Sequence, residues 1–160
     1  MPFGGARGMW SRIAEACAVT GSLAVVACGG GGGTSTEQEP ECLPQAADAS
    51  CTDPLYKPTF ENLFNNTLSQ HCGVGGCHVS SDPPLGLALD QIDTAYQDLM
   101  AKDPNGHVRV KGGDLKCGEL IVRLESVNKP WSMPRTGSDA HLDEPTLCAI
   151  RQWIAQGAQR

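Results

Sequence analysis

The chain is poor in charged and in aromatic side chains. Only 19% of its 160 residues are charged, the formal net charge is −6, and aromatic residues make up 5%. The acidic balance argues against a nucleic-acid-binding domain, because such a domain presents basic side chains to phosphates. With so few large rings the core is modest, and a cofactor or disulfides would help to stabilise it.

Motifs of common enzyme classes are also missing. The sequence contains no Ser-His-Asp arrangement, no phosphate-binding loop and no paired carboxylate motif. Because these motifs are missing, we expect a protein that is not an enzyme.

The apolar run over residues 16–27 is shorter than the roughly 20 residues that a membrane-spanning helix needs.

Cysteine and turn-forming residues are abundant instead. Eight cysteines in a chain of this length indicate an oxidising compartment or a bound metal. The 19 glycines and 11 prolines predict many turns and long loops.

The N-terminal segment has the pattern of an export signal. Arg7 and Arg12 precede the apolar run over residues 16–27, which has the length of a signal-peptide hydrophobic region. The run leads into AVVAC, which resembles the cleavage box of bacterial lipoproteins. The resemblance implies a signal peptide over residues 1–27, a lipid on Cys28, and a periplasmic protein anchored to the outer or inner membrane. An ordinary secretory signal with an incidental cysteine is the alternative.

The rest of the chain divides into three parts. Residues 28–41 are Gly-rich and then acidic, which predicts a flexible tether. Residues 42–55 show little periodicity and are expected to form an irregular lead-in. The folded domain is expected to span residues 56–160.

Apolar spacing in the folded domain predicts an all-α fold with about four short helices and long loops. We expect these helices, each with its N-cap: residues 60–72 after Thr59, 94–101 after Asp93, 115–125 after Asp114, and 144 to about 156 after Asp143, with Gly157 ending the last. Met100 is expected on the buried face of the second of these helices.

The stretch QHCGVGGCHVSS, residues 70–81, carries the candidate site. Four residues separate Cys72 from Cys77, and His78 follows Cys77 directly. Haem attachment commonly uses C-x-x-C-H, in which two thiols bind the porphyrin edge and the histidine meets the iron from the same side. A longer loop keeps the relation between Cys77 and His78, and its glycines reach positive φ at little cost. The stretch is thus consistent with a haem site that has a wide loop.

Two other interpretations of these residues remain open. Structural zinc takes four Cys or His ligands, usually as two pairs, and the sequence offers no second pair. A disulfide between Cys72 and Cys77 would leave His78 without a chemical role.

Residues beyond this stretch resemble a known family. A helix into C…CH is followed by GLALD, LIVRL, an MP loop and a last helix reading IRQWIAQGA. This order is similar to the small c-type cytochrome domain of planctomycete- and myxobacterial-type exported proteins, and the resemblance covers about residues 56–158. It implies a cytochrome c-like fold around one haem, held covalently by Cys72 and Cys77, with His78 as proximal and Met133 as distal iron ligand.

The residues themselves also favour Met133 as the distal ligand. Once the signal is removed, Met100 and Met133 are the only methionines, and Met133 lies in a proline-rich loop. A loop residue that fills a gap is the alternative interpretation of Met133. His71, His107 and His141 are the rival ligands. His71 lies too near the attachment residues, and we expect His107 and His141 to be solvated because they lie in polar loops.

The remaining cysteines are expected in disulfides. We predict Cys42–Cys51 within the lead-in and Cys117–Cys148 between the third and last helices. These pairs account for every cysteine that is neither in the signal peptide, nor lipidated, nor bound to haem.

Together these features predict a lipid-anchored monohaem c-type cytochrome that passes single electrons. Ligation by His and Met leaves no open coordination position and tends to raise the reduction potential, which suits outer-sphere electron transfer. The acidic balance favours a redox partner protein with a basic patch. The alternative is a haem-free, disulfide-rich lipoprotein with a structural or binding role.

Overall fold

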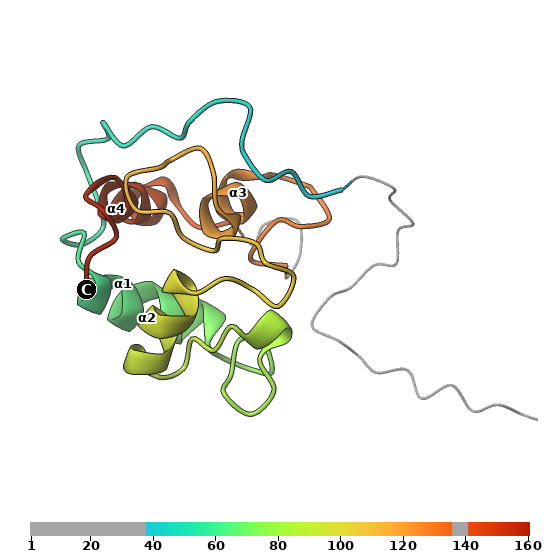
Figure 1. The fold of residues 1–160 in the computed structure, drawn as a ribbon. Helices are drawn as coiled ribbons and strands as arrows, with labels where there is room; N and C mark the ends of the chain where they lie inside the picture. The colour runs from blue at the N-terminus through green and yellow to red at the C-terminus, as the bar shows by residue number, and fades with distance from the viewer. Residues whose placement is uncertain (1–37, 136–140) are drawn as a thin grey trace, which may run out of the picture.

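The computed structural model describes residues 38–135 and 141–160. The predicted signal peptide, the predicted lipidation site Cys28 and most of the predicted tether lie outside these residues. Helices and long loops make up the described part of the chain, which contains no β-strand and two isolated β-bridges (Figure 1). The fold is therefore all-α, as predicted. Its elements are α1 (Phe60–Leu63), the π-helix η1 (Phe64–Cys72), the 3₁₀ turn η2 (Pro84–Gly86), α2 (Ile92–Met100), α3 (Glu119–Glu125) and α4 (Glu144–Ala155).

The helix that leads to Cys72 begins where the sequence predicts and then changes its winding. The hydroxyl of Thr59 accepts the Asn62 N–H at 3.4 Å and caps the first turn. From Phe64 to Cys72 the chain winds as a π-helix, a form that is rare and often found at functional sites. The N–H of Gly73 donates to the carbonyl of Leu68, five residues earlier, at 2.7 Å, which is the hydrogen-bond spacing of a π-helix.

One apolar core joins the helices. The centroid of the Phe60 ring lies 4.9 Å from that of the Tyr96 ring on α2 and 5.8 Å from that of the Trp153 ring on α4. Phe60 and Trp153 are each only 1% exposed. Around them pack the buried aliphatic side chains Leu63, Leu68, Ala95, Leu99, Ile121, Val122, Ile150 and Ile154.

Helix α2 differs from the prediction at both ends. It begins at Ile92 after Gln91, so Asp93 lies in the first turn and is not the cap. At the other end Met100 is 41% exposed, whereas Leu99 is 1% exposed. The expected core position of Met100 was wrong, because one residue turns a helix by about 100° and carries Met100 off the face that Leu99 buries.

Helix α3 begins four residues later than predicted, at Glu119. The carboxylate of Asp114 does accept backbone N–H groups, from Lys116 at 2.9 Å and Cys117 at 3.0 Å, but this closes a turn and starts no helix. Gly118 then has φ +113°, which a right-handed helix cannot contain.

Helix α4 agrees with the prediction. The carboxylate of Asp143 accepts the Thr146 N–H at 3.1 Å and caps the helix, which begins at Glu144. Gly157 follows the helix with φ +97°, the conformation that ends helices at this position.

Two disulfides attach the lead-in to the helical domain. They join Cys42 to Cys117 and Cys51 to Cys148. The four cysteines were correctly expected in disulfides, but both predicted pairs were wrong. The lead-in does not fold back on itself; it runs past α3 and α4 (Figure 1), and Leu43 N–H donates to the Lys116 carbonyl at 2.8 Å.

No helix within the described residues has both the length and the apolar character needed to cross a membrane.

Candidate functional site

Cys72, Cys77 and His78 lie on one closed loop at the end of η1. The His78 N–H donates to the Cys72 carbonyl at 3.0 Å, and the Cys77 N–H donates to the carbonyl three residues before it at 2.9 Å. Gly75 and Gly76 have φ +54° and +81°, values that other residues rarely adopt. The four-residue spacer therefore turns back and brings both ends of the motif together, as the glycines led us to expect.

The loop packs closely on the segment that follows it. A Cβ atom at Gly73 would lie 2.4 Å from the carbonyl oxygen of Leu89, so only glycine fits there. The Leu89 N–H donates to the His78 carbonyl at 2.7 Å. Gly73 is thus a site residue whose role was not seen in the sequence, where it was one of several spacer glycines.

The imidazole of His78 is fixed by a backbone contact. Its Nδ1 lies 3.0 Å from the carbonyl oxygen of Leu87. Because a carbonyl oxygen only accepts hydrogen bonds, Nδ1 carries the proton and Nε2 keeps a lone pair. Such a contact orients histidines that bind metals through the other nitrogen.

The surroundings of His78 favour the neutral ring. Burial is the main cause that lowers the pKa of His78 below its ordinary value, and the nearby charges of Arg123 and Arg109 lower it further. The hydrogen bond to Leu87 opposes them in part. The ring is therefore uncharged at neutral pH, the state in which imidazole binds metals.

Cys72 and Cys77 are present as thiols, because both disulfides use other cysteines. The alternative of a Cys72–Cys77 disulfide is not found. Burial, followed by the neighbouring Cys77 thiol, raises the pKa of Cys72 to about 11. The Cys72 thiol is therefore protonated at neutral pH and is a weak nucleophile unless it is activated.

Met133 lies in the loop between α3 and α4. It is partly buried, and it packs against the same apolar core as Cys72. Its N–H donates to the Arg123 carbonyl at 3.0 Å, and its peptide bond with Pro134 is cis. The neighbouring Trp131 is buried in the core and donates to the Ser126 hydroxyl at 3.0 Å. Trp131 thus holds the loop against the core.

The rival histidines lie at the surface. His71 and His141 are exposed, and the His107 side chain is 53% exposed. The ring of His107 also contacts the buried carboxylate of Asp103. The expectation that His107 and His141 lie in exposed polar loops is confirmed.

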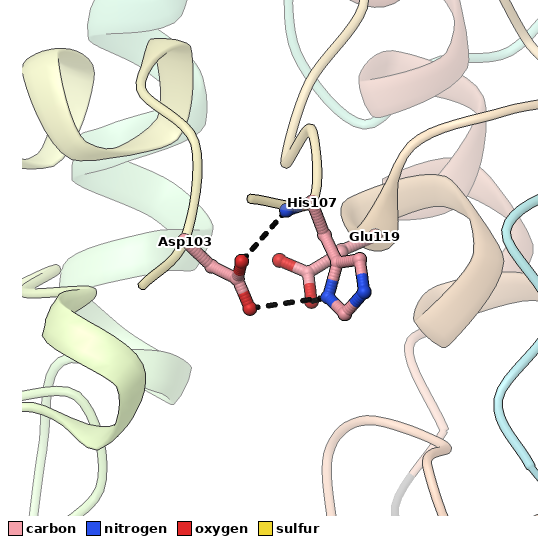
Figure 2. A group of neighbouring side chains, drawn as sticks. All are labelled: Asp103, His107 and Glu119. Carbon is pink, nitrogen blue, oxygen red and sulfur yellow. Dashed lines mark hydrogen bonds and ion pairs between the residues drawn. The ribbon is translucent and has the colours of Figure 1, made fainter. Parts of the chain in front are cut away.

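A second group of ligand-type side chains was not anticipated from the sequence. Asp103, His107 and Glu119 each offer one ligand atom, all within 4.8 Å of one another (Figure 2). Asp103 accepts the backbone N–H of His107 at 2.7 Å and lies 3.2 Å from its Nδ1. Arg123 donates to Glu119 at 2.9 Å. All three groups thus already have partners within the chain: Asp103 and His107 close the turn over residues 103–107, and Glu119 accepts from Arg123.

Comparison of the chain with protein-family models, with curated proteins and with solved structures finds no match. A function for the chain must therefore be argued from the residues themselves.

Proposed function

We propose that the chain is a monohaem c-type cytochrome that transfers single electrons. The observation that carries the proposal is the contact between His78 Nδ1 and the Leu87 carbonyl. It fixes the tautomer that presents Nε2 to a metal, on the residue directly after Cys77. The closed loop keeps the backbone of Cys72 against that of His78.

The donor set fits a covalently held haem. Thiols at Cys72 and Cys77 would hold the porphyrin edge, the His78 imidazole would be the proximal iron ligand, and the Met133 thioether the distal one. His and Met together are an iron ligand pair of cytochromes c and raise the reduction potential. The chain's part is to hold these donors, since the cofactor supplies the one-electron chemistry.

We further propose that the protein has no enzymatic activity, because two axial protein ligands leave no coordination position for a substrate. Its partner would be a redox protein with a basic patch, since this chain carries a net charge of −6. A lipid on Cys28 would anchor it at a periplasmic membrane surface. Cys28→Ser should then release the protein from the membrane fraction.

The second candidate is a haem-free, disulfide-rich lipoprotein with a structural or binding role. Both disulfides fix the lead-in to the helical domain, as in a scaffold held by cross-links. The high pKa of Cys72 also favours it, because a buried protonated thiol behaves as an inert apolar group.

Haem attachment separates the two candidates. The full chain, expressed with a haem-maturation system, should carry the mass of one haem after denaturation and show a pyridine haemochrome spectrum. Cys77→Ser should lose more haem than Cys72→Ser, because Cys77 adjoins His78. The double variant Cys51→Ser, Cys148→Ser is the control, since it removes a disulfide outside the motif, leaves Cys72 and Cys77 in place and should keep the haem. The bare polypeptide mass, from a host that matures other c-type cytochromes, would refute the proposal.

A further inference from the structure

Arg109 is a buried cation with unusual partners. The residue is 4% exposed, and its guanidinium donates to three backbone carbonyls. These belong to Asp98 at 2.8 Å, Lys102 at 3.2 Å and Leu85. The guanidinium therefore connects the end of α2 to the loop that contains η2.

The charge of Arg109 is not paired with a carboxylate in the described part of the chain, where no such oxygen lies within 4.0 Å of it. Two other arginines show the contrast: Arg123 pairs with Glu39 at 2.8 Å, and Arg151 pairs with Glu125 at 2.7 Å. Carbonyl dipoles solvate a cation without cancelling its charge. The three backbone carbonyls are therefore the groups that hold the guanidinium in place.

The loop held by Arg109 is the one that orients His78. The carbonyl of Leu85 accepts a hydrogen bond from the Arg109 guanidinium. Two residues later, the carbonyl of Leu87 accepts the His78 Nδ1–H. Leu89 then donates to the His78 carbonyl at 2.7 Å. Leu85 itself has φ +53°, which is unfavourable for a side chain and needs support from its surroundings. The Arg109 contact supplies such support.

We propose that Arg109 is a positioning residue for His78. Its guanidinium holds the Leu85 carbonyl against the end of α2, and this fixes the loop whose Leu87 carbonyl orients the His78 ring. The inference rests on the proposed cytochrome function, in which His78 is the proximal iron ligand.

Two Arg109 variants and one control are compared in the full chain: Arg109→Gln, Arg109→Lys and Leu99→Ala. Leu99→Ala is the matched control, because it removes buried packing from α2, to which Arg109 bonds, and leaves the guanidinium in place.

The positioning role is tested by nuclear magnetic resonance of the His78 ring. Exchange of the Nδ1 proton with solvent should be about tenfold faster in both Arg109 variants, the effect of losing about one hydrogen bond. Lysine should fail here, because its ammonium lacks the planar fork that reaches several carbonyls. Exchange at the Leu99→Ala rate in both variants would overturn the positioning role.

The ring-proton readout separates a failure of the positioning role from a failure of the proposed function. A wild-type chain that never carries haem would refute the cytochrome proposal, whereas the ring-proton measurement needs no haem and would still decide the positioning role. If Arg109→Gln does not fold, Arg109→Lys decides that role alone.

Discussion

The Nδ1 atom of His78 lies 3.0 Å from the carbonyl oxygen of Leu87, so the ring keeps its lone pair on Nε2. The contact depends on how closely residues 87–89 approach the loop over residues 72–78. Gly73 allows that approach, because any side chain there would meet the Leu89 backbone.

The first prediction is that Gly73→Ala destabilises the site. The added Cβ would lie 2.4 Å from the Leu89 carbonyl oxygen, and the backbone would have to shift. We expect a loss of about 1–3 kcal/mol in the free energy of unfolding, the range for overpacking, together with less attached haem. Chemical denaturation and haem content measure the two effects.

Gly106→Ala is the control for that experiment. Gly106 has φ +91°, and a Cβ there meets nothing within 4 Å, so the substitution adds backbone strain without a clash. It should leave haem content unchanged. Equal haem loss in both variants would show that the close approach at Gly73 has no special role.

The second prediction concerns the sixth iron ligand. Met133→Ala should abolish the weak near-infrared band of an oxidised Met-ligated haem, admit cyanide or imidazole readily and lower the reduction potential. Met100→Ala is the matched control: Met100 is 41% exposed, so its loss should cost no more than about 0.5 kcal/mol and keep the band. A band lost with Met100 and kept with Met133 would assign the ligand to the other methionine. A wild-type haem that lacks this band, and that binds cyanide readily only when His107 or His141 is changed, would indicate two histidine ligands.

Local signals in the sequence predicted those parts of the fold that local contacts decide. Asp143 caps the start of α4 and Gly157 follows its end, as expected, because a cap and a terminating glycine each act within one turn of the helix. Asp114 looked like a helix cap in the sequence as well, but the helix predicted after it is absent. Its carboxylate closes a turn, and Gly118 prevents that turn from continuing as a helix.

Long-range features could not be predicted in this way. The pairing of Cys42 with Cys117 depends on the path of the lead-in across the domain, and spacing alone does not determine disulfide connectivity. The contact between His78 and Leu87 and the burial of Arg109 depend on the loop around η2, which shows no periodic pattern. For the candidate site, the sequence therefore predicted the donor residues but not the residues that position them.

The third prediction is a dependence on pH that involves Asp114. The ammonium of Lys111, 2.7 Å away, and the N–H groups of Lys116 and Cys117 lower the pKa of Asp114 from 3.8 to about 2. The unfolded chain binds this proton more readily, so the contribution to stability is present above pH 3.8 and disappears as the pH falls to about 2. Because Lys111 is 60% exposed, we expect about 1 kcal/mol or less.

Urea denaturation of wild type and Asp114→Asn checks this prediction. The difference in free energy of unfolding should be largest at pH 6 and should be mostly lost near pH 2, where the Asp114 carboxyl is protonated in the unfolded chain and about half protonated in the folded one. A difference that stays constant from pH 6 to pH 2 would mean that the lost charge is not responsible.

The fourth prediction concerns the disulfide pairing, which in this structure differs from the pairing that we predicted from the sequence. Peptide mapping without reduction should recover Cys42 linked to Cys117 and Cys51 linked to Cys148. The two bonds span 75 and 97 residues, and cross-links over long loops restrict the unfolded chain most. Replacing both cysteines of either pair by serine should therefore cost about 2–5 kcal/mol in the free energy of unfolding. Haem attachment should persist in both double variants, since neither pair belongs to the loop that carries Cys72 and Cys77. Recovery of a peptide that links Cys42 to Cys51 would contradict the path of the lead-in past α3 and α4.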